Sequence, residues 1–189
     1  MGFMDALFGR RNPVMPNLDA LFAVPTAALT LQSAAGFTPT GVGSVCYRAT
    51  EGAAFSTTQS DVQQLLDADG GPAVERHTDD FGFTWLVCRQ DSDDISALVT
   101  ELHAVNRALE DSGFGPQLLC SLVGFTDADG RSLGLVYLYK RGSFYPFAPT
   151  GQQQRDNALE LQARGVLDGD LTIEPDLTRW LAIWGAPGL

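Results

Sequence analysis

The sequence predicts an α+β fold, an antiparallel sheet of about five or six strands with helices mostly on one face. Residues 94–111 place apolar side chains at i, i+3, i+4 and i+7, the spacing of an amphipathic helix. Residues 116–125 and 132–140 are apolar runs joined by an Asp-Gly turn, which is typical of a β-hairpin. A hydrophobic content of 44% with 19% charged residues is that of a folded domain.

The N-terminal part divides into a short segment and the start of the domain. Residues 2–9 have apolar side chains at helical spacing, and two prolines follow, so 1–16 is predicted to be an amphipathic segment and linker. Residues 17–189 are predicted to form a single α+β domain with an apolar C-terminal tail. Asn17 can cap a helix that Pro25 kinks or splits, and the Gly-rich stretch from Gly36 ends it.

The middle of the first half alternates strands with one short helix. Residues 41–49 are predicted to be a strand, and residues 61–69 a helix capped by Ser60. Residues 74–80 and 81–90 are then predicted to form a hairpin around an Asp-rich turn.

The second half begins with the helix at 94–111. The acidic residues at its start interact favourably with the positive end of the helix dipole. Gly113 can adopt the positive φ that ends a helix. After the hairpin come a third strand at 143–147, a helix at 155–167 and an apolar tail at 174–189.

Two stretches of the chain resemble each other. Residues 32–47 and 109–125 both run from a helix through Gly-Phe-x-Pro into a strand that contains cysteine. This echo predicts two α–β–β halves that share one sheet, with chance similarity as the alternative.

Charge and cysteine usage exclude several classes of protein. A net charge of −11 argues against nucleic-acid binding and against electrostatic attachment to anionic lipid. The three cysteines, Cys46, Cys88 and Cys120, lie far apart in apolar runs, which favours buried thiols in a reducing compartment. The first residues lack the order of a secretory signal, and no apolar run reaches about 18 residues, so we expect a cytoplasmic protein.

Motifs for metal binding or catalysis are weak. The run from Asp127 to Gly130 begins like a calcium loop, but the twelfth position is Leu138, so a hairpin turn is expected. The two histidines, His77 and His103, do not form the H-E-x-x-H pattern of zinc peptidases. We therefore assign no catalytic residue, metal ligand or cofactor. The alternative is an enzyme, such as a hydrolase, that uses one of the two histidines with a distant acid.

An aromatic cluster beside a basic pair is the strongest candidate for partner binding. Aromatic side chains and arginine dominate many protein interfaces, whereas alternate aromatics on a strand can equally pack a core. The tail offers the same choice, because it can either clamp onto the domain or anchor a partner. The candidate residues are Lys140, Arg141, Phe144, Tyr145, Phe147, Trp180 and Trp184.

Blocks along nearly the whole chain resemble the PspAB family of PspA-associated proteins. They include "MGFMDALFGR", "TELHAVNRALEDSGFGPQLLCSLVGF", "GLVYLYKRGSFYPFAP" and "WLAIWGAPGL". Some members of that family carry a label that relates them to HtpX-type membrane zinc proteases. This chain lacks the H-E-x-x-H helix that such chemistry requires, so the label does not fit it.

The resemblance implies a role in the phage-shock type of envelope stress response. The implied function is a non-catalytic adaptor or regulator of PspA that acts by protein–protein interaction, with PspAA as a second implied partner. An acidic domain of this kind would reach the inner membrane through PspA, or through residues 2–9. By analogy alone, the predicted fold is similar to YbjN and to secretion chaperones, which bind protein segments.

Overall fold

The computed structural model describes residues 16–49, 53–68, 72–151 and 153–189. The predicted helix at 2–9 and nearly all of the 1–16 segment lie outside these residues. The predicted α+β class is confirmed, since helices pack against one large antiparallel sheet.

The sheet has six strands in the order β2-β3-β1-β4-β5-β6, and each neighbouring pair is antiparallel. Their bounds are Thr38–Arg48 for β1, Glu75–Thr78 for β2, Phe83–Arg89 for β3, Leu118–Thr126 for β4, Ser132–Leu138 for β5 and Ser143–Phe147 for β6. Two short strands, β7 (Pro149–Gly151) and β8 (Gln154–Arg155), form a separate pair. All strands predicted from the sequence are present, with β1 beginning three residues earlier than expected.

Two halves of the chain do share the sheet, and they meet at β1 and β4 in its centre. Each half begins with a helix, but each contributes three strands rather than the two expected. The halves also differ in connection. In the second half β4, β5 and β6 lie side by side in chain order, whereas in the first half β3 lies between β1 and β2. The predicted α–β–β unit is therefore wrong in its strand count.

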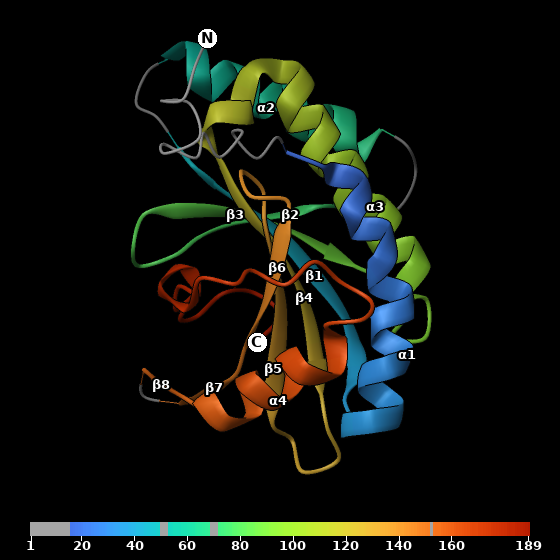
Figure 1. Ribbon diagram of the computed structural model, residues 1–189. Coiled ribbons are helices and arrows are strands. Elements are labelled where there is room, and N and C mark those ends of the chain that lie inside the picture. The colour runs from blue at the N-terminus through green and yellow to red at the C-terminus, as the bar shows by residue number, and fades with distance from the viewer. Residues whose placement is uncertain (1–15, 50–52, 69–71, 152) are drawn as a thin grey trace, which may run out of the picture.

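Helices α1 and α3 cover one face of the sheet, which we call the helix face (Figure 1). A short helix, η1 (Leu18–Ala23), runs directly into α1 (Val24–Ala35), and Pro25 sits in the first turn of α1, where its missing N–H costs nothing. Helix α1 ends at Gly36, whose φ is 75°. The expected split at Pro25 thus takes the form of a change in helix type.

The amphipathic pattern of residues 94–111 forms α3 (Ile95–Leu109). The Asp94 side chain accepts a hydrogen bond from the Ala97 amide and caps the helix. The chain then makes a wide turn, η2 (Glu110–Phe114), in which Gly113 has the predicted positive φ of 87°, and a short helix, η3 (Gly115–Gln117), leads into β4.

The two remaining main helices lie nearer the ends of the sheet. Helix α2 (Ala53–Asp67) begins seven residues before Ser60, so the predicted cap at Ser60 is wrong and that residue lies within the helix. Helix α4 (Asn157–Leu167) begins after Asp156, whose side chain accepts from the Leu159 amide, and it packs beside α1 and β6. A last short helix, η4 (Leu177–Arg179), lies in the C-terminal tail.

One helical stretch among the described residues, Leu18–Ala35, is long and apolar enough to cross a membrane on length and composition alone. The expectation that no apolar run reaches about 18 residues is therefore wrong. The same stretch buries Leu21, Val24, Ala27 and Leu31 against α3, α4 and β1, which is how the core helix of a globular domain behaves.

The C-terminal tail, residues 174–189, crosses the opposite face of the sheet, which we call the tail face (Figure 1). Two cross-strand partners, Gly124 and Gly134, make room for it. A Cβ on Gly124 would lie 2.1 Å from the Gly188 carbonyl oxygen, and one on Gly134 would lie 2.8 Å from the Leu189 side chain. Of the two alternatives for the tail, the clamp is the one observed.

Candidate partner-binding site

A pocket of about 440 Å³ opens on the tail face, and we call it the tail-face pocket. It lies at the end of the sheet where β1 and β5 finish and β4 begins, and residues 181–184 of the tail form one wall. Its volume is within the range of about 300–1,000 Å³ that ligand pockets occupy.

The sheet supplies an apolar base. Strand register places Cys46 opposite both Trp85 and Cys120, so these three side chains share the tail face. Tyr145 from β6 and Leu138 from β5 complete the base. The Tyr145 hydroxyl donates to the Leu181 carbonyl oxygen at 2.8 Å and its ring stacks on Trp180, so β6 fixes the tail wall in place.

Two exposed apolar side chains flank the pocket. Phe81, in the β2–β3 turn, is 57% exposed, and Leu181, in the tail, is 61% exposed. Burying either of them against a partner would stabilise the complex by about 25 cal/mol for each Å² of apolar surface removed from water. Exposed apolar side chains beside a concave apolar surface are typical of an interaction site.

Three cationic side chains also line the pocket. Arg48 ends β1, and its guanidinium lies 5.7 Å from the centre of the Phe83 ring. Lys140 follows β5, and its ammonium group donates to the Pro116 carbonyl oxygen at 2.7 Å while remaining exposed. Arg141 is the third, and it pairs with a buried carboxylate.

The one acidic lining residue, Asp79, already has partners. Its Oδ1 atom accepts from the Phe81 and Phe83 amides, both at 2.9 Å, and its Oδ2 atom accepts from the Trp85 indole at 2.8 Å. Asp79 therefore shapes the β2–β3 turn and orients Trp85, and its one negative charge stands against the three cations of the lining.

A buried carboxylate holds the tail at its start. Glu174 accepts from Arg141 Nε at 3.0 Å and from the Ser143 hydroxyl at 2.8 Å. Burial acts to raise the pKa of Glu174, but the hydrogen bonds from Arg141 and Ser143 outweigh it and lower the pKa below its usual value of 4.5. The Glu174 carbonyl oxygen accepts from the Trp180 indole at 3.0 Å, which bends the tail back onto the sheet.

A second buried pair, between Arg155 of β8 and Glu160 of α4, anchors the same wall. Arg155 Nε donates to Glu160 at 2.9 Å, and its Nη1 atom donates to the Trp180 carbonyl oxygen at 2.8 Å. Glu160 also accepts from the Ala148 amide at 2.9 Å. The tail wall is thus tied by polar contacts to both β6 and α4.

The Cys46 thiol in the base is a poor nucleophile. Cys46 and Cys120 are direct partners across β1 and β4, and both are buried and reduced. Hydrogen bonding to Cys120, together with burial, raises the pKa of the Cys46 thiol far above its usual range. Burial likewise raises the pKa of Cys88, which lies on the helix face. The prediction of buried, unpaired cysteines is confirmed.

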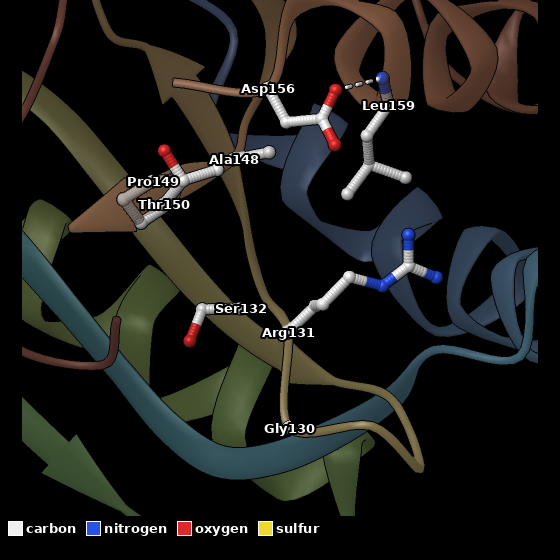
Figure 2. A pocket seen from close by; sticks show the side chains of 8 residues that line it. All are labelled: Gly130, Arg131, Ser132, Ala148, Pro149, Thr150, Asp156 and Leu159. Carbon is white, nitrogen blue, oxygen red and sulfur yellow. Dashed lines mark hydrogen bonds between the residues drawn. The ribbon is translucent and has the colours of Figure 1, made fainter. Parts of the chain in front are cut away.

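A smaller and more polar pocket lies between the β4–β5 turn and the start of α4 (Figure 2). Its charged side chains have other tasks: Arg131 Nε donates to Asp127 at 2.7 Å, and Asp156 accepts from the Leu159 amide at 2.9 Å to cap α4. Asp127 Oδ1 also accepts from the Arg131 amide, so this loop is the hairpin turn expected from the sequence. We assign no ligand to this pocket.

The histidines do not converge on either pocket. His103 lies on α3, where its Nε2 atom is 3.1 Å from Asp19 and its ring contacts Phe22. His77 is exposed on the edge strand β2, where it pairs with Trp85 of β3. Within the described residues, no group of three or more His, Cys, Asp or Glu side chains is arranged to hold a metal ion.

Comparison with protein families matches residues 1–188 to the family described as PspAB, PspA associated protein B. The chain belongs to the PspAB family. The resemblance seen in the sequence is confirmed. A search of curated proteins and a search of solved structures found no match, so the analogy to YbjN and secretion chaperones gains no support.

The predicted partner-binding residues of this PspAB protein lie in two environments, the tail-face pocket and the core, and Tyr145 belongs to both. Lys140, Arg141 and Trp184 line the tail-face pocket, together with the ring of Tyr145. Of the two alternatives for the aromatic side chains of β6, core packing is the one observed, because the tail and the helices cover the two sides of the strand. Phe144, Tyr145, Phe147 and Trp180 are at most 6% exposed and belong to the core.

The covering of β6 has a simple origin. The Phe144 amide donates to the Thr172 carbonyl oxygen and the Glu174 amide donates to the Phe144 carbonyl oxygen, which makes a short parallel bridge between Phe144 and Ile173. Residues 172–174 therefore shield the edge of the sheet. Phe144 packs on Tyr137 toward the helix face, whereas Phe147 meets Trp184 on the tail face.

Sequence reasoning missed Phe81, Leu181 and Arg48 as candidate site residues. Each stands outside the aromatic cluster. Only the sheet order brings the end of β1 and the start of β3 near the end of β5. One usable signal was present, since Phe81 is an aromatic residue in a turn, where a core role is uncommon.

Proposed function

We propose that this PspAB protein is a non-catalytic adaptor or regulator that binds PspA in the envelope stress response. The family description, PspA associated protein B, supports the partner. The observation that carries the interaction is the tail-face pocket, an open apolar surface flanked by the exposed Phe81 and Leu181. We propose that PspA docks there.

The chemistry of the pocket favours binding over catalysis. Neither histidine lines it, the Asp79 oxygens are taken up by the β2–β3 turn, and the Cys46 thiol is held protonated. A general base or activated nucleophile needs a free, suitably placed group. The pocket combines apolar surface with cationic side chains, a combination that is common in protein interfaces.

The proposed location follows from the partner. A chain with a net charge of −11 is repelled by anionic lipid, so attachment at the inner membrane would come through PspA. PspAA is a proposed second partner. Residues 2–9, which were expected to be able to contact the membrane directly, lie outside the described residues.

The test is isothermal titration calorimetry of the purified chain with purified PspA. Phe81→Ala and Leu181→Ala are expected to weaken binding by at least about fivefold each, because truncating a central apolar contact costs more than about 1 kcal/mol. Both side chains are more than half exposed, so these changes should leave the fold intact.

Matched controls exist on the helix face. Phe22 is 50% exposed and Leu29 is 68% exposed, and neither lines the tail-face pocket. Phe22→Ala and Leu29→Ala should therefore leave the PspA affinity unchanged. Absence of PspA binding by the unaltered chain would refute the adaptor function, and equal losses in both pairs of variants would refute the docking face.

A further inference from the structure

The charge of the tail-face pocket is opposite to that of the protein. The whole chain carries a net charge of −11, yet three of its 12 basic residues line this one pocket. Arg141 is neutralised by Glu174, and Asp79 adds one negative charge to the lining, so Arg48 and Lys140 leave the pocket with a net positive charge. Arg48 and Lys140 have no carboxylate within ion-pair distance among the residues that the structure describes.

These two cations are held beside apolar surface rather than left loose. Stacking on the Phe83 ring positions Arg48, and the bond to the Pro116 carbonyl oxygen positions Lys140. Cations that are held in place lose less conformational entropy when they meet an anion. The arrangement suits a ligand that brings carboxylates and an apolar group together.

Overall charge selects the kind of ligand. A broad anionic surface such as a bilayer would face the whole acidic domain, and repulsion would act over most of the contact. A narrow segment that enters the pocket meets mainly the local cations, because screening limits charge interactions to about 8–10 Å at physiological salt. An acidic peptide segment therefore fits the charge distribution of this protein better than a membrane does.

We propose that the tail-face pocket binds an acidic segment of PspA that carries one large apolar side chain. The apolar side chain fills the space between Trp85, Tyr145 and the tail wall, and neighbouring carboxylates face Arg48 and Lys140. This inference rests on the proposed function, and it adds the chemistry of the partner segment.

Lys140 makes the test specific, because it is the only lysine in the sequence. A carbodiimide joins an amine directly to a carboxylate that already touches it. Treating the complex with PspA should therefore link Lys140 to an Asp or Glu of PspA, and mass spectrometry of the digested product identifies both residues. The Lys140→Arg variant keeps the positive charge but has no lysine side-chain amine, so it should bind PspA normally and give no link at position 140.

Charge reversal supplies the second readout. Lys140→Glu and Arg48→Glu should each weaken PspA binding by at least about tenfold, and the affinity of the unaltered chain should fall as salt rises. Arg107→Glu is the control, since it makes the same change of charge at an exposed position on α3. Urea unfolding of each variant checks that the fold is retained.

The outcomes separate this inference from the proposed function. Normal binding of PspA by both pocket variants, with links formed away from Lys140, would overturn the acidic-segment assignment while the adaptor function stands. Absence of PspA binding by the unaltered chain overturns both. Saturable binding of dodecanoate that Lys140→Glu abolishes, without any effect on bound PspA, would assign the pocket to a fatty acid instead.

Discussion

Replacing Glu174 by alanine is expected to loosen the C-terminal tail from the sheet. The carboxylate is fully buried and accepts four hydrogen bonds, two from Arg141 and one each from the Ser143 hydroxyl and the Asp176 amide. Removing it leaves the buried Ser143 hydroxyl without this acceptor, while the Arg141 guanidinium, which is 31% exposed, can turn to water.

The magnitude follows from these contacts. Orphaning buried donors costs about 1–3 kcal/mol, and breaking a fully buried ion pair costs about 3–5 kcal/mol. Because water reaches the Arg141 side of this pair, we expect a loss of about 2–3 kcal/mol in the free energy of unfolding, near the upper end of the first range.

The assay is urea unfolding followed by circular dichroism and tryptophan fluorescence. With an m-value of about 2 kcal/mol per molar urea, the midpoint should fall by about 1–1.5 M. Arg179→Ala is the control, since its pair with Asp176 is exposed and worth at most about 1 kcal/mol. A Glu174→Ala midpoint no lower than that of the control would refute the reasoning.

Two further predictions concern the same face of the sheet. Folding lowers the pKa of Glu174 below 4.5, so its contribution to stability is complete above that pH and is lost as the pH falls through the lower, folded value. The difference in stability between the unaltered chain and Glu174→Gln should therefore shrink on acidification from about pH 6 to about pH 3, and a constant difference would contradict this. Gly124→Ala places a Cβ 2.1 Å from the Gly188 carbonyl oxygen and should cost about 1–3 kcal/mol or more in urea unfolding. Gly165→Ala, which meets no atom within 4 Å, should cost nothing, and equal effects would contradict the close approach of the tail.

Local patterns were sufficient to predict most of the elements. The helical spacing of residues 94–111, the Asp-Gly turn at 127–130 and the glycines at 36 and 113 each express a local preference that the packed structure retains. Ser60 shows where such reasoning fails, because a favourable cap residue also fits inside a helix when tertiary packing extends that helix.

The candidate site was harder to predict, since it depends on strand order. Phe144 and Phe147 resemble interface residues in the sequence. They belong to the core only because the helices cover one face of the sheet and the tail covers the other. Conversely, Arg48 and Phe81 join Lys140 because β1 and β5 finish, and β3 begins, at the same end of the sheet. Contacts between residues about 30–90 positions apart carry no periodic signal in a single sequence.

The meeting of β1 and β4 at the centre of the sheet makes this domain divisible. A break in the connection between β3 and α3 would leave each fragment with three neighbouring strands and one unsatisfied edge, β1 in the first and β4 in the second. Those edges are mutual templates, so each fragment alone would be prone to the wrong pairing and the two together would complement each other. The tail-face pocket draws Arg48 and Trp85 from one fragment and Lys140 and Trp184 from the other. Recovery of its ligand would thus report reassembly of the two fragments, as in a split-protein reporter.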